Sequence, residues 1–465
     1  MISNAIKSEI LVFSLRMFFS LDFLIIISYT LILLAIGFFS SRKQSRESFL
    51  ISERNITTLS GFATINATKT GAIIFIFTAL LYEYGFSAMW YFIGIVLGYI
   101  VFFPFARTLF EKSNKTFYTL ADYFFKTYGR MSGFLASGLT ILIMVGFLII
   151  NLIAATKILQ FFTGFNFTIS AVLIAFVVLA YLILAGFHAV VKTDIFQYGA
   201  VVCILAAFAL FLGNGIEIPA HEWTFFSAGT ADIFGFLLIG VLFPFASPDL
   251  WQRVYAIKDI KTLRKSLILS IVMFGVVGFI LALVGLFIKS ALPGLDPDFA
   301  LVIGLTELLP IGLSGLALVV FFAALMSSID TYVYTASSAV VQDFGRYVSQ
   351  ERTVAYIRIV IAITLVLSTV VAILVQDLIK VSFIFASFVV VLAVPTLVTW
   401  VRPAVTALTL NIAFIIGTVL LVVIAIADFT GGTLSPAIVL KGVGGSVIGL
   451  TVGVLVSKVW HLRNS

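Results

Sequence analysis

Apolar runs recur along the whole chain, and short polar segments separate them. Each run holds about 20 residues, which is enough for a helix to cross a hydrocarbon core of ~30 Å. Apolar and polar residues do not alternate within the runs, as they do in membrane β-barrels. The pattern predicts an all-α membrane protein with about thirteen transmembrane helices, at 21–40, 60–84, 88–108, 131–156, 168–187, 194–213, 233–251, 266–288, 311–343, 354–375, 379–400, 404–427 and 436–457.

Polar or helix-breaking clusters interrupt the second and the seventh of these runs. The second contains Asn66–Gly71, a group of poor helix formers, and the seventh contains Pro244 and Pro248. The two runs lie five apart, and a repeated five-helix unit has opposite membrane orientation in its two copies. Paired breaks of this kind mark the midplane binding site of inverted-repeat transporters. We therefore expect an inverted repeat of five plus five helices with a broken first helix in each repeat.

This arrangement divides the chain into four parts. An N-terminal peripheral helix and inner loop occupy 1–59, the two repeats occupy 60–213 and 214–400, and two C-terminal peripheral helices occupy 401–465. The longest loops have about 20 residues, too few for a soluble nucleotide-binding domain. The chain by itself is therefore not expected to use ATP.

Composition and charge support a membrane location. The chain is 62% hydrophobic and only 11% charged, too little charge for a soluble protein of 465 residues. Its net charge of +7 comes from lysines and arginines in the short loops, the pattern of the positive-inside rule and not of nucleic-acid binding. Their distribution predicts an N-terminus outside and a C-terminus inside, in an inner or plasma membrane. The expected partners are the lipid bilayer and a small organic solute, with no obligate protein partner. One cysteine and three scattered histidines provide no disulfide framework and no histidine or cysteine metal site.

Several short motif segments occur between about residue 21 and residue 400. They are Leu21-Asp22 with 37–43, 119–124, 185–194 with Gln197, 250–253 with Lys258 and Asp259, and 323–330 with Ser337, Ser338 and Asp343. Each alone is weakly specific, but together and in this order they resemble the sodium:solute symporters, the family of proline, sugar, sialic acid and pantothenate carriers. The resemblance implies the five-plus-five fold and a sodium-coupled carrier.

Small and hydroxyl residues share one face of the ninth predicted helix. Ala324, Ser327, Ser328 and Thr331 follow the spacing i, i+3, i+4, i+7. Hydroxyl and carbonyl oxygens suit a small hard cation. The resemblance implies that Ala324, Ser327 and Ser328 line a sodium site, together with backbone around Asn66. The alternative is that small residues only allow close helix packing.

Two carboxylates have candidate roles in ion coupling or gating. The resemblance ties Asp194 to a further sodium ion or to gating, while its place near a helix start also suits a cap. Asp330 follows the serine pair inside a span, where an ionisable group indicates function if it has a partner. We expect that partner to be Lys69.

Lys69 is the main departure from the family, which usually has an apolar side chain there. Its position about nine residues into a span places it roughly 14 Å deep. An ammonium beside Ser327, Ser328 and Asp330 would stand in for sodium, carry a proton or pair with a solute carboxylate. The remaining alternative is a lysine in a water-filled vestibule.

The sequence favours a secondary transporter that moves a small organic solute by alternating access, with sodium as coupling ion. Thr68, Thr70 and Ser247 lie at the two interruptions and are the candidate solute-binding residues. The alternatives are a proton-coupled or cation-independent carrier, in which Lys69 replaces sodium, and a transporter-like membrane sensor. No catalytic motif favours an enzyme, and apart from sodium no cofactor is expected.

Overall fold

A computed structural model describes residues 46–183, 187–212, 217–310, 312–345 and 352–464, with two isolated positions, 28 and 31. These parts are helical, and their only β-type pairing is an isolated bridge between Ile56 and Ile257. The α-helices are α3 (Arg46–Ile51), α4 (Thr58–Tyr84), α5 (Met89–Ser113), α6 (Leu120–Tyr128), α7 (Arg130–Thr163), α8 (Phe167–Leu182), α9 (Phe187–Leu212), α10 (Thr230–Leu242), α11 (Pro248–Ala256), α12 (Ile260–Ala291), α13 (Ala300–Leu308), α14 (Leu313–Ala339), α15 (Thr353–Val375), α16 (Leu378–Val401), α17 (Ala407–Thr430) and α18 (Ile438–Asn464). Short 3-10 or π turns are η2 (Ser52–Arg54), η3 (Gly85–Ala88), η4 (Ala220–Trp223), η5 (Phe243–Ala246), η6 (Pro297–Phe299) and η7 (Val340–Phe344).

The described part of the chain holds nine helical segments long and apolar enough to span a membrane, or ten with a bent pair. One of the nine, Thr58–Ser113, contains both α4 and α5. The predicted span 21–40 lies almost wholly outside the described residues. The number thirteen therefore stays a prediction, whereas the all-helical membrane class is confirmed.

The predicted interruption of the seventh span is confirmed. The helix α10 is followed by η5, an extended Ser247 and α11, with a bend of 43° between the two halves. Pro248 has no N–H to donate to the carbonyl of Pro244, so the helical ladder fails here. The indole of Trp251 donates to that carbonyl instead, at 3.2 Å, and satisfies it inside the protein.

The predicted break at Asn66–Gly71 is wrong, because α4 is one continuous helix from Thr58 to Tyr84. Its polar side chains bond back to their own helix. Thr68 Oγ1 donates to Thr64 O at 3.0 Å, Thr70 Oγ1 to Asn66 O at 3.2 Å, and Asn66 Nδ2 to Phe62 O at 2.8 Å. The modest helix propensities of these residues are thus overridden by local bonding and by packing on all sides.

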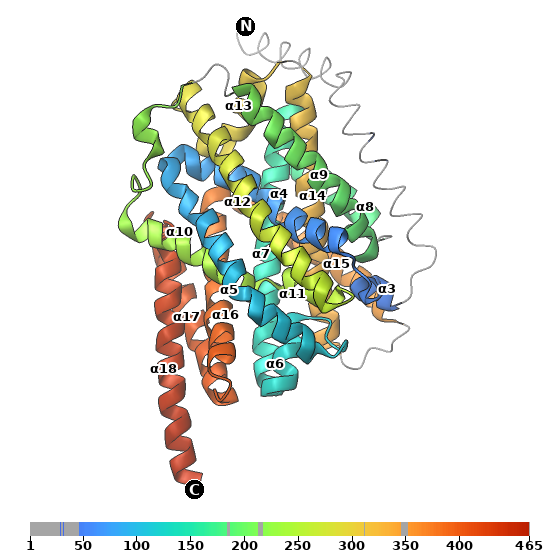
Figure 1. The fold of residues 1–465 in the computed structure, drawn as a ribbon, viewed down its shortest axis with the longest axis vertical. Coiled ribbons are helices and arrows are strands. Elements are labelled where there is room, and N and C mark those ends of the chain that lie inside the picture. The colour runs from blue at the N-terminus through green and yellow to red at the C-terminus, as the bar shows by residue number, and fades with distance from the viewer. Residues whose placement is uncertain are drawn as a thin grey trace.

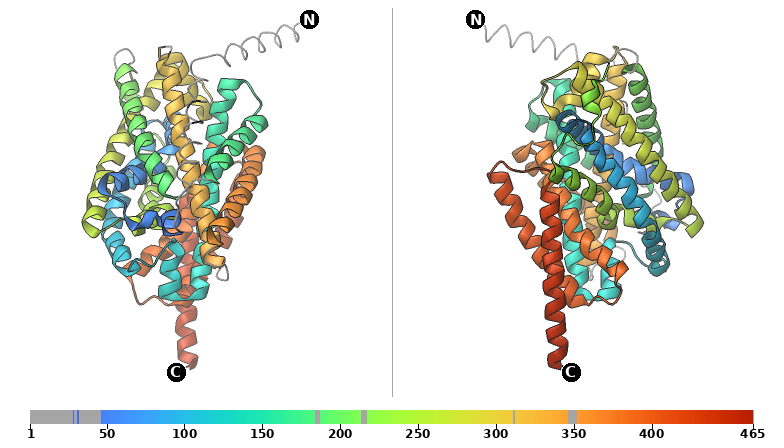
Figure 2. Two further views of the ribbon diagram at one scale, coloured as in Figure 1. Left: turned by 90° about the vertical axis from the view of Figure 1, so that its right-hand side faces the viewer. Right: turned by 60° about the vertical axis from the view of Figure 1, so that its left-hand side comes forward.

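Helices far apart in sequence pack against one another around the centre. α4 packs on α12, and α10 packs on α5. α7 packs on α14, and α5 packs on α12. The middle of the molecule is enclosed by α4, α7, α14 and η5–α11 (Figure 1). α17 and α18 lie against each other, and the C-terminal end of α18 projects beyond the other helices (Figure 2).

Candidate functional site

A buried polar cluster lies where α4, α9, α11 and α14 meet. It contains two cations and two carboxylates with almost no exposure: Lys69 at 3%, Asp194 at 0%, Asp249 at 1% and Arg253 at 0%. Charges are expensive to bury unless each has a partner. Each of these four groups has polar partners within the cluster.

Asp194 on α9 joins three helices. Its Oδ2 accepts from Thr64 Oγ1 and its Oδ1 from Ser327 Oγ, both at 2.5 Å. Arg253 Nη2 lies 3.5 Å from Oδ2. The carboxylate therefore acts as a bridge between α4, α14 and α11, not as a cap at an exposed helix start.

Arg253 extends along the hydroxyl face of α4. Its Nε donates to Thr64 Oγ1 at 2.9 Å and its Nη2 to Thr68 Oγ1 at 2.6 Å. A longer bond of 3.3 Å joins Nη2 to Thr331 Oγ1 on α14. The guanidinium thus lies among the groups surrounding Asp194.

Lys69 pairs with the broken helix, so the expected pairing with Asp330 is wrong. Its Nζ donates to Ser247 Oγ at 2.6 Å and lies 2.9 and 2.8 Å from the two carboxylate oxygens of Asp249. The ammonium also lies 4.4 Å from the centre of the Phe243 ring. The physical reason is the bend, which turns Ser247 and Asp249 towards α4.

The helix α4 is held from outside at Thr68 and Ala72, although it is continuous. The Thr68 carbonyl accepts from Ser328 Oγ at 3.3 Å and Tyr332 Oη at 2.9 Å. In an α-helix the Ala72 N–H is the usual donor to the Thr68 carbonyl. Here the Ala72 N–H donates to Asn151 Oδ1 on α7 at 3.0 Å. Side chains of other helices therefore satisfy backbone groups at the middle of α4.

Oxygen atoms of α4 and α14 converge at this point. Ser328 Oγ lies 3.3 Å from Thr68 O and 3.2 Å from Ala324 O. The close approach requires Gly71, where an added Cβ would lie 1.9 Å from Ser328 Oγ. No group of three histidine, cysteine, aspartate or glutamate residues that could hold a metal occurs in the described part of the chain. The oxygens here are hydroxyl and carbonyl groups, which suit an alkali cation.

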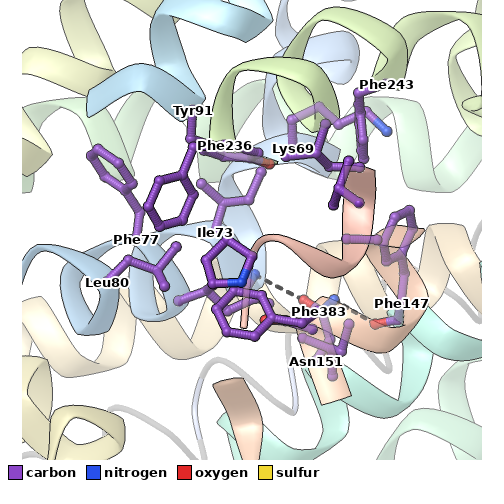
Figure 3. A pocket seen from close by; sticks show the side chains of 18 of the residues that line it. Lys69, Ile73, Phe77, Leu80, Tyr91, Phe147, Asn151, Phe236, Phe243 and Phe383 are labelled. Carbon is purple, nitrogen blue, oxygen red and sulfur yellow. Dashed lines mark hydrogen bonds between the residues drawn. The ribbon is translucent and has the colours of Figure 1, made fainter. Parts of the chain in front are cut away.

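A cavity of about 90 Å³ opens beside these groups. That volume has room for roughly six water molecules or a solute of similar size. Figure 3 shows Phe77, Leu80 and Tyr91 on one side, with Phe147 and Asn151 on the other. Thr68, Lys69, Tyr332 and Ser382 also line it, so one polar edge faces an aromatic and aliphatic wall.

The remaining predicted residues lie elsewhere. Asn66 Nδ2 donates to Ser270 Oγ on α12 at 2.8 Å, so the side chain points away from α14. Thr70 bonds only to carbonyls of its own helix among its described contacts. Asp330 is buried on α14 with 4% exposure.

Asp249 and Arg253, the partners of Lys69 and Asp194, were not predicted as site residues from the sequence. One signal was available, because Asp249 and Arg253 are four residues apart and share a face of the span that the prolines break. An ionisable residue within an apolar span indicates function. Asn151 and Tyr332 gave no such signal, since polar residues of these types are common in helices.

Comparison with known proteins identifies relatives of the chain. The model of the sodium:solute symporter family matches residues 49–233 and 219–401. Sodium/proline symporter 2 of Staphylococcus saprophyticus is 27% identical over 360 aligned positions, which cover 71% of this chain and 69% of the relative. The osmoregulated proline transporter OpuE of Bacillus subtilis is 26% identical, with coverage of 68% and 70%.

Solved structures have the same fold. A sodium-coupled sialic acid symporter in a substrate-bound outward-open state matches with a TM-score of 0.77 and 19% identity, over 94% of this chain and 98% of that one. The nucleobase-cation-symport-1 family transporter Mhp1, in a closed conformation with bromovinylhydantoin bound, matches with a TM-score of 0.59 and 15% identity. That second match covers 90% of this chain and 97% of Mhp1.

Proposed function

The chain belongs to the sodium:solute symporter family, and we propose that it binds its coupling sodium between α4 and α14 and its solute in the adjoining cavity. It is a secondary transporter, so the sodium gradient supplies the free energy for moving a small organic solute. The observation that carries the proposal is that Thr68 O and Ala324 O both lie close to Ser328 Oγ, at 3.3 and 3.2 Å.

Sodium would be bound by these oxygens and by Ser327 Oγ. Dehydrating a small cation requires several oxygen ligands at once, and a hydroxyl pair beside two carbonyls supplies them. Because Ser328 and Tyr332 already bond Thr68 O, sodium would displace hydroxyl protons from that carbonyl and draw α14 towards α4. Asp194 accepts from Ser327 and would hold this hydroxyl in place. Because Asp194 lies on α9 and contacts Arg253 of α11, sodium binding would also shift the positions of these two helices.

The solute would have an apolar body and one polar end. Aromatic and aliphatic side chains form most of the cavity wall, whereas Lys69, Asn151 and Tyr332 form a short polar edge. Lys69 Nζ has three protons, and Ser247 and Asp249 occupy two of its directions. Because Lys69 also lines the cavity, a solute carboxylate would share the ammonium with these two partners. The two relatives are named as a proline symporter and a proline transporter, which supports a compact solute of this kind.

The helices would form two inverted repeats, with α4, α5, α7, α8 and α9 corresponding to α10–α11, α12, α14, α15 and α16. The reciprocal packing of α4 on α12 and α10 on α5 supports this assignment, because a two-fold axis exchanges those pairs. Under it, α4 and the bent α10–α11 occupy equivalent positions facing the site.

Sodium binding to the purified protein tests the proposal without knowledge of the solute. We expect Ser328→Ala to weaken equilibrium binding of ²²Na⁺ about tenfold, because one ligand is lost, equivalent to about 1.4 kcal/mol. Ser446→Ala on α18 is a matched control, since Ser446 Oγ is buried and also bonds a carbonyl four residues back. Equal sodium affinity in parent, Ser327→Ala and Ser328→Ala would contradict the proposed site.

A second candidate is a cation-independent carrier, favoured by the resident guanidinium of Arg253 and the ammonium of Lys69. Proteoliposome uptake of candidate solutes against sodium and pH, in the parent and in Lys69→Met, separates the two. Sodium-stimulated accumulation in the parent supports symport. Uptake unaffected by sodium in the parent, with sodium dependence gained in Lys69→Met, supports the carrier. Solute binding without any uptake would support a membrane sensor.

A further inference from the structure

A groove on the outer surface lies between α5 and α12, away from the central site. It has a volume of about 560 Å³ and is lined by the C-terminal half of α5 and the N-terminal half of α12. The two helices pack against each other, as Figure 1 shows. None of the groups discussed above lines this groove, so it is a separate feature of the protein.

The groove is basic at one end and apolar at the other. Arg107, Lys261 and Arg264 line the basic end, and Ile100, Phe103 and Ile268 continue it along the two helices. Arg107 and Ile100 are seven residues apart, about 10 Å along α5. The two ends therefore match the distance from a lipid phosphate to the upper part of its acyl chains.

Exposure places the groove at the edge of the hydrocarbon core. Ile100 is 51% exposed and Ile268 is 45% exposed, on helices that are long and apolar enough to span a membrane. Such surfaces face lipid. The side chains of Lys261 and Arg264 are also exposed, and that of Arg107 is 69% exposed. These cations are therefore accessible where the apolar surface ends.

The charge of the basic end favours an anionic ligand. Three cations and one anion line it, and the anion, Glu111, pairs with Arg107 at 2.8 Å. At the same end of α12, exposed Lys258 and Lys265 outnumber the one exposed carboxylate, Asp259. A net positive cluster attracts a phosphate that lacks a compensating ammonium, and basic pockets between transmembrane helices are suited to anionic headgroups.

We propose that this groove binds an anionic phospholipid, with the phosphate on Arg107, Lys261 and Arg264 and an acyl chain along Ile100, Phe103 and Ile268. Free phosphate would use only the basic end. A zwitterionic lipid would bring a choline cation into a positive cluster. The bound lipid would join α5 to the N-terminal end of α12 and so stabilise the folded protein, because a ligand that binds only the folded state raises its stability.

Lipid titration of the detergent-solubilised full chain tests the proposal. Thermal unfolding would be followed while phosphatidylglycerol, phosphatidylcholine or inorganic phosphate is added. We expect phosphatidylglycerol alone to raise the Tm of the parent. The triple variant Arg107→Gln, Lys261→Gln, Arg264→Gln should need about tenfold more of this lipid for half of the shift, and Arg264→Gln alone an intermediate amount.

The control variant removes the same charge elsewhere and should behave as the parent: Lys115→Gln, Lys126→Gln, Arg130→Gln, three exposed positions outside the groove. Size-exclusion profiles check that each variant is folded before titration. An equal requirement for phosphatidylglycerol in the triple variant and the control would overturn the proposal. So would an equal rise in Tm with phosphatidylcholine or with inorganic phosphate.

Discussion

At the scale of single residues, the ion pair of Lys69 and Asp249 is the contact whose disruption should matter most. Both side chains are buried, so removing one leaves the other charge with weaker partners only, at a cost of up to about 3–5 kcal/mol. Asp249 would keep Arg253 at 3.9 Å, and Lys69 would keep the neutral hydroxyl of Ser247. We expect Lys69→Met and Asp249→Asn each to lower the Tm and the folded yield. The double variant Lys69→Met, Asp249→Asn should lose much less than the sum of the two.

An exposed pair provides the comparison. Arg107 and Glu111 are as close, at 2.8 Å, but their side chains are 69% and 56% exposed. Removing either should leave the Tm nearly unchanged, since water screens such pairs. If the loss in the double variant equals the sum of the losses in Lys69→Met and Asp249→Asn, a direct coupling between these two charges is contradicted.

Several residues of the buried polar cluster could be singled out from the sequence, but their partners could not. Ser327 and Ser328 were identified by helical spacing together with the family resemblance, and both lie in the cluster. The partner of Lys69 was missed because Asp249 is 180 positions away in sequence and is positioned by the geometry of a bend. Spacing along one helix carries no information about which residue another helix brings opposite it.

At the scale of helices, the same limit explains one confirmed and one incorrect prediction. Two prolines remove backbone donors whatever surrounds them, so the interruption between α10 and α11 follows from the sequence. Threonine and asparagine only weaken a helix, and packing decides the outcome. In α4 the surrounding helices keep the helix continuous and bond Thr68 O and Ala72 N from outside.

The crossing of α5 and α10 depends on glycines that no side chain can replace. An added Cβ would lie 2.4 Å from Leu237 O at Gly94, 2.5 Å from Val241 O at Gly98, and 2.4 Å from Tyr91 O at Gly240. The obstructing atoms belong to the backbone, so a rotamer change cannot relieve the clash. We expect Gly98→Ala to destabilise the protein by about 1–3 kcal/mol.

Thermal unfolding in detergent would measure this effect, with Gly275→Ala on α12 as the control. A Cβ at Gly275 meets no atom within 4 Å, so that substitution should leave stability unchanged or raise it by up to about 1 kcal/mol through helix propensity. Similar Tm values for Gly98→Ala and Gly275→Ala would show that the crossing tolerates a wider separation.

At the scale of the whole molecule, the fold brings motif segments that are far apart in the sequence together at the buried polar cluster. Three motif segments noted in the sequence meet there, because Asp194, Arg253 and Ser327 belong to different ones and contact one another through Asp194. Another two meet at Thr119, whose Oγ1 donates to Asp343 Oδ1 at 2.8 Å. The order of these motif segments along the chain is visible in the sequence, whereas the contacts between them depend on the fold.

The last prediction concerns how the chain is oriented in the membrane. Most lysines and arginines lie in alternate loops, and thirteen spans with an outer N-terminus put these loops on the cytoplasmic side. In a Cys203→Ser background, single cysteines at Ser3 and His221 should react with a membrane-impermeant maleimide added to whole cells. Cysteines at Lys258 and Ser465 should react only after the cells are permeabilised. His221 and Lys258 have exposed side chains in the structure and therefore serve as internal references for the two faces. Labelling of Ser3 and Ser465 from one face would require an even number of spans, and reversed labelling at His221 and Lys258 would invert the whole protein.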